Sequence, residues 1–77
     1  MPAQDNKYAP PPLDALIAEL QLKNADLVKN STEQLTFKQV AKARLGKPVT
    51  LNIQHKIANA LNRCVGEERF KITDLFA

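Results

Sequence analysis

The chain has few of the residues on which enzymatic or metal-binding chemistry depends. Its 77 residues include one cysteine, one histidine and two glycines. A single cysteine excludes an intramolecular disulfide and a cysteine-rich zinc cluster. No Gly-rich phosphate loop is present, and the acidic residues are scattered along the chain. We therefore expect no enzymatic activity, no metal or other cofactor, and no small-molecule ligand.

Long apolar runs are also missing. None approaches the roughly 18 residues that span a bilayer, and the polar start MPAQDNKY lacks the apolar segment of a signal peptide. We expect a cytoplasmic protein that does not contact membranes. Aromatic residues are limited to Tyr8 and three phenylalanines. RNA is therefore a weak candidate partner, because its unpaired bases are commonly stacked on aromatic side chains.

The single histidine and the single cysteine both fall in a segment with helical spacing. His55 lies between the apolar residues Ile53 and Ile57, which predicts a solvated surface position. Cys64 is in register with Ile57 and Leu61, which predicts packing in the core instead of a reactive thiol. A domain of this size buries only about 60% of its unfolded surface, so no deep substrate cavity is expected.

Positive charge is concentrated in the middle of the chain. Residues 1–22 carry a net charge of −2 and residues 64–77 a net charge of −1. Residues 23–63 carry +6, from eight basic residues against Asp26 and Glu33. Such a distribution is typical of a surface that faces phosphates, although a solvated lysine-rich face has the same composition.

The first third of the chain predicts an arm and two helices. Residues 1–12, with three consecutive prolines, are expected to form a flexible arm whose last proline opens a helix, although an arm that lies in a groove or against a neighbour is an alternative. A helix over residues 12–22 is indicated by apolar residues at helical spacing, Leu13, Leu16, Ile17 and Leu20. Asn24 is expected to cap a second, short helix that directs Leu27 and Val28 inward.

The next segment carries clear signals for the start and end of a third helix. Thr36 and Gln39 have the spacing of a capping box, and Gly46 is a typical helix terminator. Val40 and Ala43 are expected to face inward. This helix, from Thr36 to Gly46, leaves most of its polar residues on the outer side.

The last third predicts a fourth helix and a final turn. Thr50 is expected to cap the helix and Gly66 to end the segment. Its inward residues are predicted to be Ile53, Ile57, Ala60, Leu61 and Cys64. The tail is expected to form a loop and a turn capped by Thr73, with Leu75 and Phe76 packed inward, although a strand through Phe70 and Ile72 is an alternative. The fold class is therefore all-α, with four or five short helices around one core.

The outer face of the Thr36 to Gly46 helix suits the major groove of DNA. Gln can pair with adenine, Lys can donate to guanine, and Phe can contact a thymine methyl. The candidate base contacts are Phe37, Lys38, Gln39 and Lys42. Phe37 has a second interpretation, which we favour, in which its ring packs as core beneath the preceding helix.

Phosphate contacts are expected on both sides of this helix. Helix N-termini carry positive partial charge, and basic residues lie beside them. The candidate phosphate contacts are Lys23, Asn24, Thr36, Arg44, Lys47, Thr50 and Asn52. For Asn24 and Thr50 the alternative is a purely structural role as helix caps.

The residues from Leu22 to Phe76, taken in their order along the chain, resemble the Cro and phage-repressor (XRE) helix-turn-helix family. The matching pieces are Leu27-Val28, Leu35-Thr36, Val40, Gly46, Lys47-Pro48-x-Thr50, the run Lys56-Ile57-Ala58-x-Ala60-Leu61-Asn62, and Asp74-Leu75-Phe76. The resemblance implies a compact four- to five-helix bundle of the lambda-repressor-like type over residues 13–77. It also implies a sequence-specific, double-stranded-DNA-binding transcription regulator, a small repressor that acts as a homodimer.

Two features depart from the family pattern. The segment between Val28 and Leu35 is about two residues longer than the usual turn. Arg44 replaces an acidic residue that is commonly structural in the family, so we expect Arg44 to contact phosphate instead. The longer segment leaves open the angle between the second and third helices.

A protein-interaction module, such as an antitoxin-like or phage accessory protein, is the alternative function. Its contact surfaces would be the proline-rich arm and the apolar C-terminal residues Phe70, Ile72 and Phe76. Salt dependence separates the two functions, because binding through phosphates weakens steeply with salt whereas an apolar contact changes little.

Overall fold

The computed structural model describes residues 11–76, and these form five helices. The helices are α1 (Pro12–Glu19), α2 (Asn24–Asn30), α3 (Phe37–Arg44), α4 (Leu51–Val65) and α5 (Ile72–Leu75). No strand occurs within the described range, so the all-α prediction is confirmed and the alternative strand at residues 70–72 is wrong. The arm predicted for residues 1–12 lies outside the described residues except for Pro11 and Pro12.

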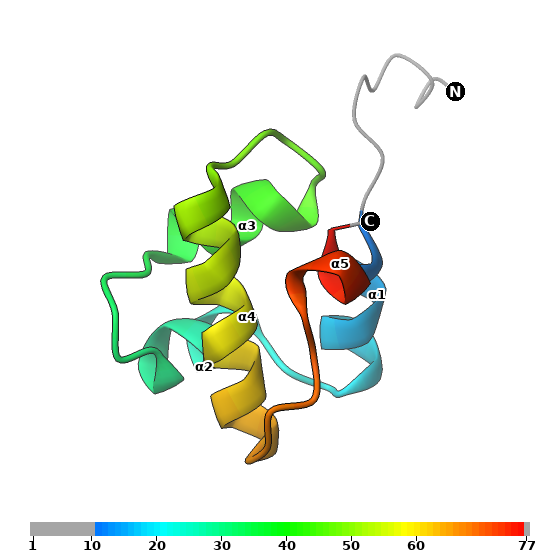
Figure 1. The fold of residues 1–77 in the computed structure, drawn as a ribbon, viewed down its shortest axis with the longest axis vertical. Coiled ribbons are helices and arrows are strands. Elements are labelled where there is room, and N and C mark those ends of the chain that lie inside the picture. The colour runs from blue at the N-terminus through cyan, green and yellow to red at the C-terminus, as the bar shows by residue number, and fades with distance from the viewer. Residues whose placement is uncertain (1–10, 77) are drawn as a thin grey trace.

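The longest helix, α4, runs through the centre of the bundle (Figure 1). Helices α2 and α3 pack against it, and α5 packs against both α4 and α1. All five helices contribute to one buried cluster, which consists of Leu13, Ile17, Leu27, Leu35, Val40, Ala43, Ile57, Ala58, Ala60, Leu61 and Leu75. Because every helix buries apolar side chains in this cluster, the short helices stabilise one another through it.

Helix α1 begins as predicted but ends earlier. Pro12 is its first residue, where the missing amide hydrogen costs nothing. The helix ends at Glu19, so the predicted limit at residue 22 is wrong. Gln21 adopts a left-handed conformation with φ of 59°, and the amide of Leu22 donates to the carbonyl of Ile17 at 3.0 Å. This turn brings Leu22 against the core.

The starts of α2 and α5 differ from the prediction in the same way. Lys23 precedes α2, and its amide donates to the carboxylate of Asp26 at 2.7 Å, so the predicted cap at Asn24 is wrong. Likewise Lys71 precedes α5, and its amide donates to Asp74 at 3.0 Å, so the predicted cap at Thr73 is wrong. In both places the third residue of the helix is an aspartate. Its carboxylate accepts from the backbone amide of the residue that precedes the helix, which is the carboxylate half of a capping box.

The predicted ends of α3 and the start of α4 are confirmed. Thr36 Oγ1 accepts from the amide of Gln39, and Gln39 Oε1 accepts from the amide of Thr36, both at 3.1 Å. Gly46 follows α3 with φ of 85°. Thr50 Oγ1 accepts from the amide of Ile53 at 3.2 Å and caps α4. These signals involve only near neighbours in sequence, so they can be recognised without the fold.

The C-terminal segment is held against α4 by one side chain. Asn62 Oδ1 accepts from the amides of Arg69 (3.0 Å) and Phe70 (2.8 Å), and its Nδ2 donates to the carbonyl of Phe70 at 3.0 Å. The chain therefore returns along α4, and Leu75 of α5 is fully buried. Phe76 is partly buried against the core, which agrees with its predicted inward position.

Candidate nucleic-acid interface

Three side chains of α4 support the long connection between α2 and α3, residues 31–36. Lys56 Nζ donates to the carbonyl of Gln34 at 3.2 Å, and Asn59 Nδ2 donates to the carboxylate of Glu33 at 3.2 Å. Arg63 Nε donates to the carbonyl of Asn30, at the end of α2, at 2.9 Å. The connection is thus attached to α4 at several points. Sequence reasoning missed this role, although residues 56, 59 and 63 share one helical face.

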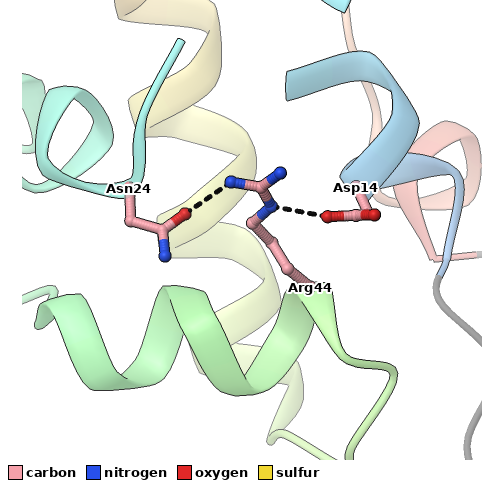
Figure 2. A network of polar contacts seen from close by, with 3 residues as sticks. All are labelled: Asp14, Asn24 and Arg44. Carbon is pink, nitrogen blue, oxygen red and sulfur yellow. Dashed lines mark hydrogen bonds and ion pairs between the residues drawn. The ribbon is translucent and has the colours of Figure 1, made fainter. Parts of the chain in front are cut away.

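The C-terminal end of α3 is tied to two other helices by Arg44 (Figure 2). Its Nε donates to Asp14 Oδ1 of α1 at 2.7 Å, and its Nη1 donates to Asn24 Oδ1 at the start of α2 at 2.8 Å. The side chains of Arg44 and Asp14 are 23% and 38% exposed. This network fixes how α3 lies across α1 and α2.

Arg44 and Asn24, both predicted to contact phosphate, have partners within the protein that the sequence did not indicate. Arg44 donates to Asn24 Oδ1 as well as to Asp14, and the phosphate contacts stay predictions. The physical reason is the opposite charge of Asp14, which lies thirty positions away in sequence and attracts the guanidinium. Arg44 therefore positions α3 through these two hydrogen bonds.

The predicted inward and outward faces of α3 are largely as expected. Val40 and Ala43 are buried, whereas Lys38 and Lys42 are exposed. Gln39 is half-buried because its side chain closes the capping box. The helix is therefore anchored to the core on one side and presents basic residues on the other.

Phe37 is the exception to the favoured interpretation. Its side chain is 58% exposed, so the prediction that it packs beneath α2 is wrong. Leu35, two residues earlier, occupies the core position and is only 6% exposed. Phe37 is the first residue of α3 and points away from the buried core, which leaves an aromatic ring at the start of the basic face.

Three exposed lysines lie on α3 or just after it, in a segment without acidic residues. Residues 34–66 contain six basic residues and no Asp or Glu. Three of them hold the fold together: Arg44, Lys56 and Arg63. The other three, Lys38, Lys42 and Lys47, are exposed, and the only ion pair within residues 11–76 joins Arg44 to Asp14.

The remaining candidate phosphate contacts lie at helix starts and in the turn before α4. Lys23 and Thr36 are exposed immediately before α2 and α3. Lys47, Thr50 and Asn52 are exposed around the start of α4. Thr36 and Thr50 use their hydroxyl oxygens as caps, and each hydroxyl hydrogen is free to donate to an incoming oxygen.

A polar groove of about 620 Å³ lies elsewhere, between the α2–α3 connection and the C-terminal end of α4. Its lining includes Glu33, Glu67 and Glu68 against the single basic residue Arg63. The acidic excess disfavours phosphate there. The groove therefore does not compete with the basic face of α3 as a site for nucleic acid.

His55 and Cys64 occupy the positions that the sequence predicted. His55 is exposed on α4. Cys64 is partly buried, with Sγ 3.6 Å from the carbonyl of Asp26. Burial raises the pKa of the Cys64 thiol, the negative charge of Asp26 raises it further, and a hydrogen bond with Asn30 lowers it. The thiol is consequently held in its protonated, less reactive form near neutral pH.

In residues 11–76 no three His, Cys, Asp or Glu side chains are grouped as metal ligands would be. None of the five helices combines the length and apolar character needed to cross a bilayer.

Comparison of the chain with models of protein families, with curated proteins and with solved structures found no match. The resemblance to the XRE family thus rests on the sequence motifs alone.

Proposed function

We propose that the protein is a sequence-specific DNA-binding transcription regulator, a small repressor that places α3 in the major groove. The observation that carries this proposal is the basic outer face of α3, where Lys38 and Lys42 are exposed opposite the buried Val40 and Ala43. The XRE-like motif order supports the same function.

The dimensions and anchoring of α3 suit insertion into DNA. A helix with its side chains is about 10–12 Å wide and the major groove is about 12 Å wide. Because Val40 and Ala43 hold one side in the core and Arg44 ties the C-terminal end to α1 and α2, the orientation of α3 is fixed before binding. Such preorganisation lowers the entropic cost of ordering the helix on DNA.

Gln39 can serve both the fold and the DNA. Its Oε1 accepts from the amide of Thr36, but an amide oxygen has two acceptor sites. Adenine needs one acceptor for its N6 amino group and one donor for N7, and Gln39 has Nε2 for the second. The capping box therefore holds the amide group at the start of α3 without removing its capacity to pair with a base.

Phosphate binding is assigned to the residues around the helix starts. Lys47 supplies full charge in the turn before α4, and Lys23 supplies it before α2. Thr36, Thr50 and Asn52 add hydrogen-bond donors at the starts of α3 and α4, where backbone amides carry positive partial charge. These contacts would set the register of α3 on the duplex.

The salt dependence of binding to duplex DNA tests this function. We expect the logarithm of the affinity to fall with the logarithm of the salt concentration, with a slope of about −0.9 for each phosphate contact. Three to five contacts would give a slope of about −3 to −5. Lys42→Ala should weaken binding, whereas Lys29→Ala, which removes an exposed lysine of α2, is the charge-matched control. An affinity that does not change as the salt concentration is raised would contradict the proposal.

The alternative, a protein-interaction module, receives less support from the structure. Its predicted contact surfaces are the proline-rich arm, most of which lies outside the described residues, and the apolar residues Phe70, Ile72 and Phe76. These three are partly buried against the core. Much of their apolar surface is thus used within the protein. No feature of residues 11–76 specifically favours this function over DNA binding.

A further inference from the structure

Phe37 is an apolar side chain in an unusual position. Within residues 11–76 it is one of three large exposed apolar residues, together with Leu45 (52% exposed) and Leu51 (63%). Of the three, it alone lies in the first turn of α3, between the cap Thr36 and Lys38. The first turns of a recognition helix are those that reach base edges. Its ring therefore stands where the proposed function requires specificity.

The charge around Phe37 indicates what covers it. Lys38 and Lys42 lie on the same helix, and residues 34–66 contain no acidic side chain. A second copy docked on this face would place like charges together, which opposes association. Duplex DNA offers the complementary combination, because phosphates flank the groove and the C5 methyl of thymine is an apolar group on its floor.

We propose that Phe37 contacts the C5 methyl of a thymine, so that the recognised site contains a required thymine opposite the start of α3. This inference rests on the proposed DNA-binding function. The Thr36–Gln39 capping box fixes the backbone from which the ring projects. Because the ring is 58% exposed, its removal should change binding while leaving the core intact.

The experiment begins with duplexes selected from a random pool by the full chain. Each thymine of the selected site is then replaced in turn by deoxyuridine, which lacks only the methyl group. At one or two positions we expect the affinity to fall about three- to fourfold, the effect of one buried methyl-sized group. Phe37→Ala should bind the thymine and uracil duplexes equally well at those positions.

Leu45→Ala is the matched control, because Leu45 has similar exposure at the opposite end of α3. It should retain the preference for thymine. Thermal unfolding of both variants should match the parent. The deoxyuridine measurements on the unmodified protein keep the test valid even if a variant unfolds.

Failure of the thymine contact can be distinguished from failure of the proposed DNA-binding function. A selected site whose affinity does not depend on any thymine methyl overturns the inference alone. The inference is also overturned if Phe37→Ala lowers the affinity for thymine and uracil duplexes by the same factor. The variant would then keep the preference for thymine, so the ring could not be its source. A pool that yields no preferred sequence overturns the proposed sequence-specific function, and this inference with it.

Discussion

Arg44 Nε lies 2.7 Å from Asp14 Oδ1, and this ion pair joins the C-terminal end of α3 to the first turn of α1. Arg44 also donates to Asn24, at the start of α2. Three helices that are separate in sequence thus meet at one guanidinium (Figure 2). The geometry makes Arg44 a positioning residue for α3.

This assignment predicts coupling between Asp14 and Arg44. In a double-mutant cycle of Asp14→Ala, Arg44→Ala and both together, unfolding in urea should give a coupling free energy of about 1 kcal/mol, because the pair is partly exposed. Both single variants should also weaken DNA binding by loosening α3. If Arg44 contacted phosphate instead, Asp14→Ala would release it and strengthen binding.

Residues that contact bases and residues that contact phosphate should behave differently. Gln39→Ala or Lys38→Ala should relax base preference at one position and cost about 1–3 kcal/mol per lost contact. Lys47→Ala should weaken all duplexes alike and reduce the salt slope by about one. Fluorescence anisotropy with duplexes altered one base pair at a time measures both effects. Equal responses of the three variants to every duplex would refute the division of roles.

Gln21 offers a prediction about stability alone. Its φ of 59° is unfavourable for a side chain with a Cβ atom, and the residue is exposed. Gln21→Gly should therefore raise the free energy of unfolding by about 0.5–1 kcal/mol, since relief of strain exceeds the added freedom of the unfolded chain. Gln21→Ala, which keeps the Cβ atom, should give no such gain. A destabilised glycine variant would mean that the left-handed turn is not strained.

The features that sequence reasoning identified correctly are mostly local. Thr36, Gly46 and Thr50 interact with residues within a few positions of themselves, so their spacing alone predicts the ends of α3 and the start of α4. The buried positions Val40 and Leu61 follow from helical periodicity for the same reason.

The features that it missed depend on contacts between distant parts of the chain. Arg44 meets Asp14 across thirty positions, and Arg63 meets the carbonyl of Asn30 across thirty-three. Nothing near these residues in sequence indicates their partners. Phe37 was misassigned because an apolar residue at a helix start can face either side, and the choice was decided by Leu35, which fills the core.

We predict that the protein binds DNA as a homodimer. Helix α3 has eight residues and can read only a few base pairs, so two half-sites about 34 Å apart would be needed for selectivity. The candidate dimer contact consists of Phe70, Ile72 and Phe76. Part of the apolar surface of each is already buried against the core, so the area left for a second copy is small. Association should therefore be weak without DNA. Sedimentation with a selected duplex should show two protomers, and one protomer on a non-palindromic site would disprove the dimer.

Mapping the DNA contact on the protein tests the central claim most directly. Amide chemical shifts would be followed while a selected duplex is added to the full chain at low salt. If α3 enters the major groove, the largest changes should lie in residues 36–52, with smaller changes beside Lys23. Changes centred instead on the acidic groove near Glu67, with none in α3, would contradict binding through α3.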